Sequence, residues 1–299
     1  MDQAGLLREM RGMYRDYYGI NLGDRQKKRK KDVRVIAITS GKGGVGKTNI
    51  AANFAYIFSK MGERVLLLDA DTGLANIDVI LGITPEYSLF HVLHGEKTLS
   101  EATVQGPGGI KILPAASGIQ EMAELSGGQK LTLLKELDGF IENLDFVFID
   151  TAAGIAENVM YFNMMAEEMI VVVSPEPTSL TDAYALIKLL YHSYAAKRFK
   201  LLVNMVTGPV EAKEVYGRLN SATDHFLNFS IEYLGYILRD KTVHEAVKQQ
   251  TMLVKFSPNS KASKCLFMVA EKLYQERPED YESKTIKVFG GTNADRYNG

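Results

Sequence analysis

The chain has 299 residues, of which 46% are apolar and 24% are charged, so global disorder, collagen and coiled-coil classes are excluded. Its 35 basic and 36 acidic residues leave a formal net charge of −1, which argues against nucleic-acid binding by the molecule as a whole. The single cysteine, Cys265, excludes an intramolecular disulfide and a multi-cysteine zinc or iron–sulfur site within one chain. Neither a signal-peptide pattern nor an apolar run of about 18 residues is present, so we expect a cytoplasmic protein.

Residues 1–20 are predicted to form a separate amphipathic helix, because apolar side chains recur at three- and four-residue steps at Leu6, Met10, Met13 and Tyr17. Residues 21–32 are predicted to be a linker, and seven of the ten residues from Arg25 to Arg34 are basic. A solvated tether accounts for this charge. Contact with anionic lipid or nucleic acid is the alternative.

From residue 33 onward, short continuous apolar runs alternate with helical patterns. The expected strands are 33–39, 64–69, 110–114, 146–150, 169–173, 200–206 and 232–238. Helices are expected at 48–61, 128–137, 155–166, 179–194 and 264–275, among others. This alternation predicts an α/β fold with a doubly wound, mostly parallel sheet covered by helices on both faces. We expect this domain to span residues 33–277 and a polar, frayed tail to occupy 278–299.

The strongest chemical signal lies between the first expected strand and the first expected helix of this domain. The segment from Ser40 to Thr48 reads SGKGGVGKT and contains the phosphate-loop pattern G-x-x-x-x-G-K-[ST]. Backbone N–H groups of such a loop converge on phosphate oxygens, and the helix N-terminus adds positive potential. Lys47 is placed to neutralise the β and γ phosphates, and the Thr48 hydroxyl to ligate Mg²⁺. The predicted nucleotide-binding residues here are Gly41, Lys42, Gly43, Gly44, Val45, Gly46, Lys47, Thr48 and Asn49.

A second lysine inside the loop, Lys42, has no evident task within one protomer, because it cannot easily reach its own nucleotide together with Lys47. The motif KGGVGKT resembles the deviant phosphate loop of the ParA/MinD ATPase superfamily. In that family the first lysine reaches across a dimer to the partner's nucleotide. The resemblance therefore implies an ATP-bound homodimer with Lys42 as a catalytic residue.

Two acidic residues end the next expected strand. The segment from Asp69 to Asn76 is similar to the first switch of the superfamily, D-x-D-x-G-x-x-N. The resemblance implies that Asp71 orients the attacking water and that Asp69 supports the magnesium site. Carboxylates at strand ends that face the phosphate loop suit this work. A helix-cap or turn role for either residue is the alternative.

Four apolar residues and an acid, Phe146 to Asp150, form a Walker B pattern, in which Asp150 holds Mg²⁺ through water. The following Thr151-Ala152-Ala153-Gly154 resembles the second switch, where the family more often has glycine or proline at the Ala152 position. Alanine restricts the backbone, so switch mobility and the hydrolysis rate are in question here. The expected magnesium-site residues are Thr48, Asp69, Asp71 and Asp150.

By resemblance, Asn204 at the end of a later strand hydrogen-bonds adenine, although a simple strand-end turn would also explain it. Asp240 is expected to flank the base. The loop from Ser174 to Ser179 matches another loop of the family, and no chemistry is assigned to it.

The N-terminal segment narrows the resemblance. Residues 2–8, DQAGLLR, match the D-Q-A-x-x-L-R signature of the FlhG family of MinD-like ATPases, which control flagellar number and placement. The resemblance implies an FlhF-type GTPase and the flagellar switch complex (C-ring) as partners. It also implies ATP-dependent contact with the cytoplasmic membrane. The expected partner-binding residues are Asp2, Gln3, Ala4, Leu7 and Arg8. An amphipathic helix packed on its own domain is the alternative.

The last expected helix has an apolar face that could be a weak membrane anchor or, as we favour, part of the core. Three other functions compete with flagellar regulation. The first is a ParA-type positioning ATPase that uses DNA or the division site. The second, an iron–sulfur carrier ATPase, lacks the bridging cysteines it would need. The third is a nucleotide-dependent scaffold with vestigial hydrolysis, which Ala152 leaves open.

Overall fold

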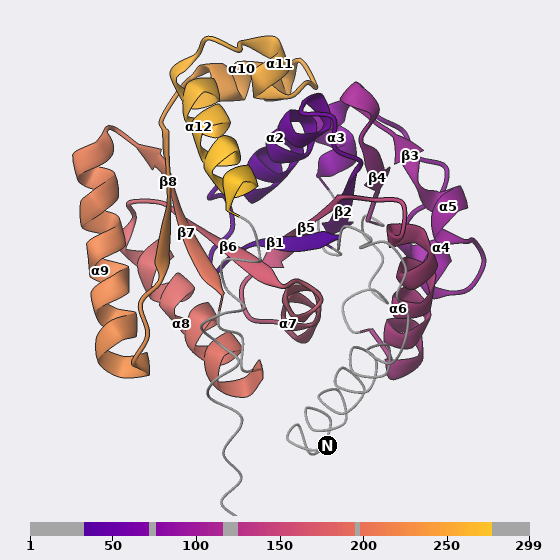
Figure 1. Cartoon of the computed structure of the whole chain (residues 1–299), viewed down its shortest axis with the longest axis horizontal. Helices are drawn as coiled ribbons and strands as arrows, with labels where there is room; N and C mark the ends of the chain where they lie inside the picture. The colour runs from indigo at the N-terminus through magenta and orange to yellow at the C-terminus, as the bar shows by residue number, and fades with distance from the viewer. Residues whose placement is uncertain (1–32, 72–75, 116–124, 195–197, 277–299) are drawn as a thin grey trace, which may run out of the picture.

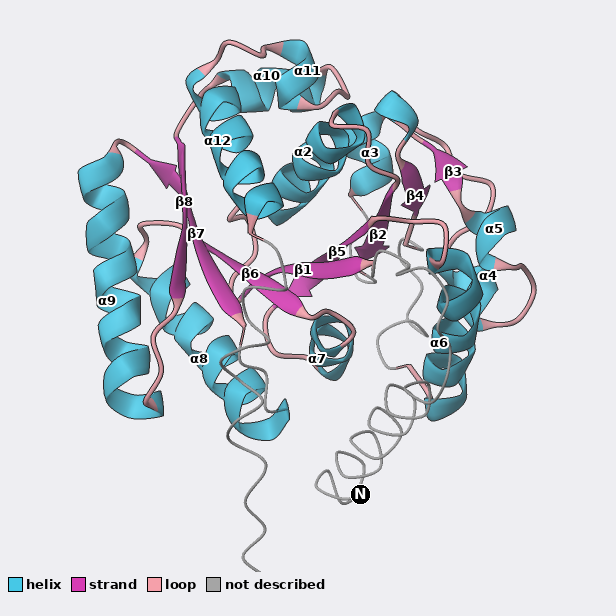
Figure 2. Ribbon diagram, viewed as in Figure 1, coloured by secondary structure: helices cyan, strands magenta, loops and turns pink. Residues whose placement is uncertain are grey.

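The computed structural model describes residues 33–71, 76–115, 125–194 and 198–276. An eight-stranded sheet runs through the centre with helices on both faces, as Figures 1 and 2 show. Its strand order is β3-β4-β2-β5-β1-β6-β7-β8, and every neighbouring pair is parallel except β3 with β4. The strands are β1 (Arg34–Ser40), β2 (Val65–Ala70), β3 (Val104–Gln105), β4 (Lys111–Leu113), β5 (Phe146–Ala153), β6 (Glu168–Val173), β7 (Phe199–Val206) and β8 (Glu232–Leu238).

The helices follow the strands in chain order. They are α2 (Lys47–Lys60), α3 (Ile77–Leu81), α4 (Leu89–Leu93), α5 (Leu99–Ala102), the 3₁₀ turn η1 (Pro107–Gly109), α6 (Gly127–Ile141), α7 (Glu157–Met164), α8 (Pro177–Tyr194), α9 (Pro209–Leu227), α10 (Thr242–Lys248), α11 (Leu253–Phe256) and α12 (Lys261–Gln275). The proposed segments 1–20, 21–32 and 278–299 lie outside the described residues.

The continuous apolar strands contribute side chains to two hydrophobic cores, one on each face of the sheet. In β1, Ile36 and Ile38 pack with α2, α11 and α12, whereas Ala37 between them packs with α7 and α8 on the other face. Successive strand side chains point to opposite faces, so a strand covered on both sides must be apolar throughout. The doubly wound, mostly parallel fold expected from the sequence is confirmed.

Some elements do not follow from the expected pattern. The strand β3 pairs antiparallel with β4. It has only two residues, which are too few to give a periodic signal in the sequence. The helix α9 was not among the expected helices, although its buried residues Ala212, Val215 and Leu219 have helical spacing. The short helices α3, α4, α5, α10 and α11 and the turn η1 also had no expected range. The elements with an expected range agree with it to within a few residues at their ends.

The last described helix, α12, belongs to the core. Leu266, Ala270 and Leu273 are buried against α2 and β8, and only a few apolar side chains such as Met268 face outward. The structure therefore supports the core interpretation of this helix over the anchor interpretation. Among the described residues, no helix combines the length and apolar character needed to cross a bilayer.

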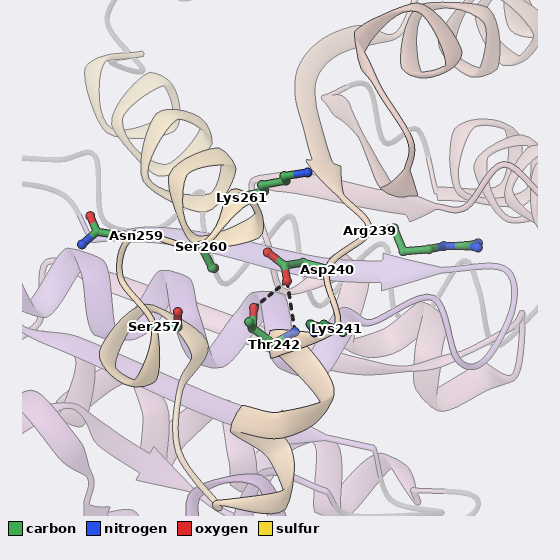
Figure 3. Close-up of a pocket in the computed structure, with 8 residues that line it drawn as sticks. All are labelled: Arg239, Asp240, Lys241, Thr242, Ser257, Asn259, Ser260 and Lys261. Atoms are coloured by element: carbon green, nitrogen blue, oxygen red, sulfur yellow. Dashed lines mark hydrogen bonds between the residues drawn. The ribbon is translucent and has the colours of Figure 1, made fainter.

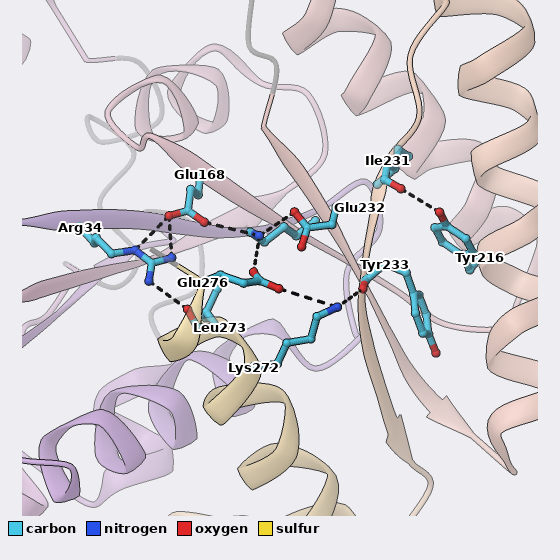
Figure 4. A network of polar contacts seen from close by, with 10 residues as sticks. Arg34, Glu168, Tyr216, Ile231, Glu232, Tyr233, Lys272, Leu273 and Glu276 are labelled. Carbon is cyan, nitrogen blue, oxygen red and sulfur yellow. Dashed lines mark hydrogen bonds and ion pairs between the residues drawn. The ribbon is translucent and has the colours of Figure 1, made fainter. Parts of the chain in front are cut away.

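Charged side chains meet at the amino ends of the central strands (Figure 4). Arg34 donates to Glu168 at 2.7 and 3.1 Å and to the Leu273 carbonyl at 2.9 Å. Lys200 donates to Glu232 at 2.7 Å and to Glu276 at 2.5 Å. We call these five side chains, Arg34, Glu168, Lys200, Glu232 and Glu276, the amino-end network. It ties β1, β6, β7 and β8 to the end of α12.

Candidate functional site

The phosphate loop connects β1 to α2 at the carboxyl edge of the sheet. Gly46 precedes α2 with a φ of 93°, and a Cβ there would lie 2.5 Å from Asn204 Nδ2. A Cβ on Gly41 would lie 2.1 Å from the backbone carbon of Asp182 in α8. Glycine is therefore required by close packing at both positions, and at Gly46 by the backbone angle as well. The loop backbone stays open toward the start of α2, where anions are favoured.

Lys47 is curled into this loop. Its side chain is almost buried, and Nζ donates to Ser40 Oγ at 2.9 Å. Ser40 in turn donates to the Lys42 carbonyl at 2.7 Å. Burial lowers the Lys47 pKa, and the charges of Asp150 and Asp71 oppose that shift. The site thus holds a partly desolvated cation ready to contact an anion.

Two carboxylates lie side by side on neighbouring strands. Asp69 of β2 is in register with Asp150 of β5, and both are buried. Burial raises the Asp150 pKa to about 7, and the nearby Thr48 hydroxyl and Lys47 charge act in the opposite direction. Burial also raises the Asp69 pKa, with the Asp150 charge adding to the shift. The pair stores repulsion that a cation would relieve.

These two carboxylates differ in their contacts. Asp69 accepts from the backbone N–H of Asp71 at 3.0 Å and, more weakly, from that of Ile77 at 3.4 Å. These are turn and helix-cap contacts, the alternative considered from the sequence. In contrast, neither Asp150 oxygen has a hydrogen bond of good geometry within the described part of the chain. The acceptor capacity of Asp150 is therefore available for a ligand.

Lys42 has a partner in its own chain, which corrects the expectation that it has no task within one protomer. Its Nζ donates to Glu176 Oε2 at 2.5 Å and to Thr178 Oγ1 at 3.0 Å. The pairing with Lys42 lowers the Glu176 pKa. The loop from Ser174 to Ser179, to which no chemistry was assigned, thus holds the second lysine. Sequence reasoning missed this contact because 134 positions separate the two charges.

The first residues of the predicted second switch belong to strand β5. β5 extends through Ala152, which is half-buried and packs against the core. The left-handed backbone in this segment is at Gly154, with a φ of 95°, and Gly154 N donates to the Ser40 carbonyl at 2.9 Å. Alanine at position 152 therefore creates no backbone strain in this conformation.

Asn204 faces the phosphate loop rather than open space. Its Nδ2 donates to the Val45 carbonyl at 2.8 Å, and its Oδ1 accepts from the next backbone N–H, that of Met205. A cavity of about 500 Å³ opens beside it and is also lined by Gly46 and Asn49. The cavity is mostly apolar, with walls from α2, β8 and α10, which suits a flat heterocyclic ring.

Asp240 lines this cavity, but its carboxylate is already engaged. Oδ1 accepts from the backbone N–H and the hydroxyl of Thr242 at 3.0 and 2.7 Å, and Oδ2 accepts from Ala262 N at 3.2 Å. Figure 3 shows it beside a second, open hollow that Arg239, Lys241 and Lys261 also line. These contacts fix the start of α10 to the start of α12. Asp240 is thus a structural connection at the edge of the cavity.

The structure brings Lys42, Lys47, Thr48, Asp69, Asp71, Asp150 and Asn204 to one edge of the sheet, as the sequence predicts. The residues 72–75 of the first switch lie outside the described residues. So do the predicted partner-binding residues Asp2, Gln3, Ala4, Leu7 and Arg8. Their roles stay predictions.

Comparison with known proteins agrees with this geometry. Residues 33–202 match the family described as AAA domain. The chain is 46% identical over 241 residues to the antiactivator FleN of Pseudomonas aeruginosa, covering 81% of this chain and 86% of the relative. The flagellum site-determining protein YlxH of Helicobacter pylori is 36% identical over 242 residues, covering 81% and 82%.

The chain belongs to the FleN/YlxH family. Its fold is that of the MinD-like phosphate-loop ATPases. The septum site-determining protein MinD of Pyrococcus horikoshii, solved in complex with Mg-ADP, superposes with a TM-score of 0.69. The two are 26% identical, and the match covers 82% of this chain and 97% of MinD. The FleN/YlxH assignment agrees with the flagellar family expected from the sequence.

Proposed function

We propose that this protein is a switch ATPase that dimerises with ATP and regulates the number and placement of flagella. The observation that carries the proposal is the buried pair of Lys47 and Asp150 at the loop that starts α2, in a chain of the FleN/YlxH family. A partly desolvated cation beside a carboxylate without hydrogen bonds is costly unless a ligand completes the site.

ATP is the ligand that fits. The backbone of residues 41–46 and the Lys47 ammonium would hold the phosphates. The base would enter the cavity beside Asn204, whose amide already lies against the loop. Asn49 would contact the nucleotide from the first turn of α2. Of the two predicted base contacts, Asn204 is the stronger one. Its Nδ2 uses one N–H on the Val45 carbonyl and keeps a second to donate, whereas both Asp240 oxygens already accept from Thr242 and Ala262.

Mg²⁺ fits the donors present here. Both Asp150 oxygens are buried without a good hydrogen bond, and the Thr48 hydroxyl is close enough to affect the Asp150 pKa. Oxygen donors of this kind are those that Mg²⁺ prefers, with waters and phosphate oxygens completing the shell. The ion would neutralise the negative charge that builds up on the phosphates during transfer. Asp150 would hold it through water and Thr48 directly, while Asp69 supports the site from the neighbouring strand.

Dimerisation would change the partner of Lys42. In the single chain Lys42 pairs with Glu176 and Thr178, and its side chain is 37% exposed. In the proposed dimer this lysine would leave Glu176 to stabilise charge on the partner's nucleotide. Asp71, half-buried beside Asp69, would orient the attacking water.

The N-terminal segment supplies the proposed flagellar output. We take residues 1–20 as a helix that stimulates an FlhF-type GTPase, with Gln3 near the partner's catalytic centre and Arg8 securing the interface. Residues 21–32 would be the tether and 33–277 the ATPase domain. The flagellar switch complex and the inner face of the cytoplasmic membrane would be further binding partners of the ATP-bound form.

The test is sedimentation of the full chain with ATP and Mg²⁺. Asp71→Ala should stay dimeric because its ATP is not hydrolysed, and Lys42→Ala should lose turnover. Lys47→Ala, which loses the phosphate contact, should bind no ATP and serves as the control for the assay. A monomeric Asp71→Ala protein at micromolar concentration would contradict the switch.

A synthetic peptide of residues 1–20 tests the output separately. It should stimulate the partner GTPase alone, and Gln3→Ala or Arg8→Ala should remove most of that effect. No change in GTP turnover with the peptide would show that this segment is not the activator.

A further inference from the structure

A buried polar cluster beneath the nucleotide site joins three elements. Asn163 of α7 is fully buried, and its Nδ2 donates to Thr39 Oγ1 of β1 at 3.1 Å. The Thr39 and Thr151 hydroxyl oxygens lie 3.0 Å apart, and Thr151 belongs to β5. Thr39 directly precedes the phosphate loop, and Thr151 directly follows Asp150. The cluster therefore touches the loop strand, the second switch and the helix behind it.

The direction of these hydrogen bonds follows from the donors available. Asn163 Nδ2 also donates to the Val159 carbonyl at 2.7 Å, and this contact fixes which end of the amide faces Thr39. Thr39 therefore accepts from Asn163. Thr39 Oγ1 also accepts from the Thr151 hydroxyl at 3.0 Å, and that hydroxyl lies within reach of the Ile38 and Ala152 carbonyls as well. The Thr39 oxygen is thus a shared acceptor that links the Asn163 amide to the Thr151 hydroxyl.

The cluster lies at an irregularity in the sheet. β1 and β5 pair Ile38 with Asp150 and then Ser40 with Ala153, so β5 carries one extra residue opposite Thr39. Such bulges re-aim the neighbouring side chains and often lie beside active sites. This one follows Asp150 directly, and the Thr39 and Thr151 hydroxyls lie within it.

An asparagine side chain at position 163 costs free energy of folding. Its Oδ1 is buried and has no hydrogen-bond partner in the described residues, while neighbours such as Val159 and Phe162 are apolar and buried. An unsatisfied buried acceptor destabilises a fold, and leucine has the same branching and the same number of side-chain heavy atoms without that acceptor. Hydrogen-bond satisfaction alone would therefore favour an apolar side chain at position 163.

We propose that Asn163 is a positioning residue for ATP hydrolysis, acting through Thr39 and Thr151 to hold the β5 bulge and so the Asp150 carboxylate. This inference rests on the ATPase function proposed above. Substitution should affect turnover more than nucleotide binding, because none of the three cluster residues lines the base cavity.

The experiment compares Asn163→Leu with Asn158→Leu in the full chain. Asn158 is a matched control, since it is a buried asparagine on the same helix, and its Oδ1 accepts from Leu125 N at 3.1 Å away from the cluster. Asn163→Leu should lower kcat about tenfold, the rate equivalent of losing one oriented hydrogen bond. Its KM for ATP should stay within twofold, and its Tm should stay the same or rise. Asn158→Leu should lower Tm and leave kcat within twofold.

A second pair of variants tests the hydrogen bonds that link Asn163 to Thr151 through Thr39. Thr39→Val removes the hydroxyl acceptor and should lower kcat as much as Asn163→Leu does. Thr39→Ser keeps the hydroxyl and should have the kcat of the wild type. The Asn163→Leu, Thr39→Val double variant should be no slower than either single variant, since both break one chain of contacts.

Two results would overturn the inference: wild-type kcat in Asn163→Leu, or a loss of Tm that matches its loss of kcat. The parallel wild-type and Lys47→Ala measurements separate this from the proposed function. A wild-type protein without Lys47-dependent ATP turnover would refute the ATPase assignment, and the inference with it.

Discussion

The two ends of the central strands both bury charge, but they treat it in opposite ways. At the amino ends, Arg34 and Lys200 meet Glu168, Glu232 and Glu276 in a network whose charges are paired. At the carboxyl ends, two buried carboxylates face each other with one lysine close by, and the Asp150 oxygens make no good hydrogen bond in the described residues. The same sheet therefore has one edge whose buried charges are paired and one frustrated edge.

The two kinds of buried charge have different roles, one in holding the fold together and one in binding a ligand. A paired buried charge holds elements together and resists change, since removing one member leaves the others unpaired. An incompletely paired charge destabilises the free protein and is relieved when a ligand of the right charge arrives. Substitutions at the two edges should thus shift stability in opposite directions, and the predictions below test that contrast.

The largest effect is expected from Lys200→Met at the amino-end network. It leaves Glu168, Glu232 and Glu276 close together without their shared cation, and breaking a buried pair costs about 3–5 kcal/mol of unfolding free energy. Urea denaturation should show this loss, while ATP affinity stays unchanged. Lys264→Met, at an exposed lysine of α12, is the control and should be neutral. A loss below about 1 kcal/mol would mean that the network does not hold the edge together.

A smaller effect of opposite sign is expected from Asp150→Asn. The Asp150 pKa is raised to about 7, above its ordinary value of 3.8, so the folded state binds a proton that the unfolded state has released. The wild-type contribution from this group is therefore most favourable at low pH and is lost as pH rises through about 7.

The neutral amide avoids that loss. Asp150→Asn should be more stable than wild type in the nucleotide-free state by about 1–3 kcal/mol at pH 8, and the gap should shrink toward pH 5. Thermal unfolding across this pH range measures it. The same variant should lose Mg²⁺-dependent ATP turnover. A variant less stable than wild type at pH 8 would show that the carboxyl edge is not frustrated.

The smallest effect on stability is expected from Glu176→Gln. The Lys42–Glu176 pair is exposed, so solvent screens it and Tm should not change measurably. Its effect should instead appear in dimerisation: Lys42 loses its charged partner within the chain, keeps only the Thr178 hydroxyl, and becomes available at a lower ATP concentration. Sedimentation over an ATP titration should show an earlier dimer transition. Glu211→Gln, at an exposed glutamate of α9 that contacts Thr207, is the matched control.

Much of the carboxyl edge could be predicted because its signals are local in sequence. The loop from Gly41 to Thr48 has its pattern within eight residues, and Asp69 and Asp150 each end an apolar run. Parallel strands then bring these ends to one edge as a consequence of topology. This is why the fold class and the group of charged residues at the carboxyl edge agree with the structure.

Contacts between distant segments could not be predicted in this way. Arg34 and Glu168 are 134 positions apart, and neither lies in a motif, so the amino-end network has no sequence signal. Asn163 was included in an expected helix without any role, because its partner Thr39 lies 124 positions earlier. Asp240 was expected at the base, but two backbone N–H groups from different helices occupy its carboxylate.

The bond from Arg34 to the Leu273 carbonyl joins the first strand to the last helix across 239 positions. The described fold is therefore closed on itself, and a circular permutant with these ends linked and a new opening in the exposed turn at Gly95 should keep its architecture. This contact between the two ends of the described fold lies at the amino edge of the sheet, opposite the proposed nucleotide site. A change of sequence before Arg34 or after Glu276 should therefore leave the shape of the carboxyl edge unaltered.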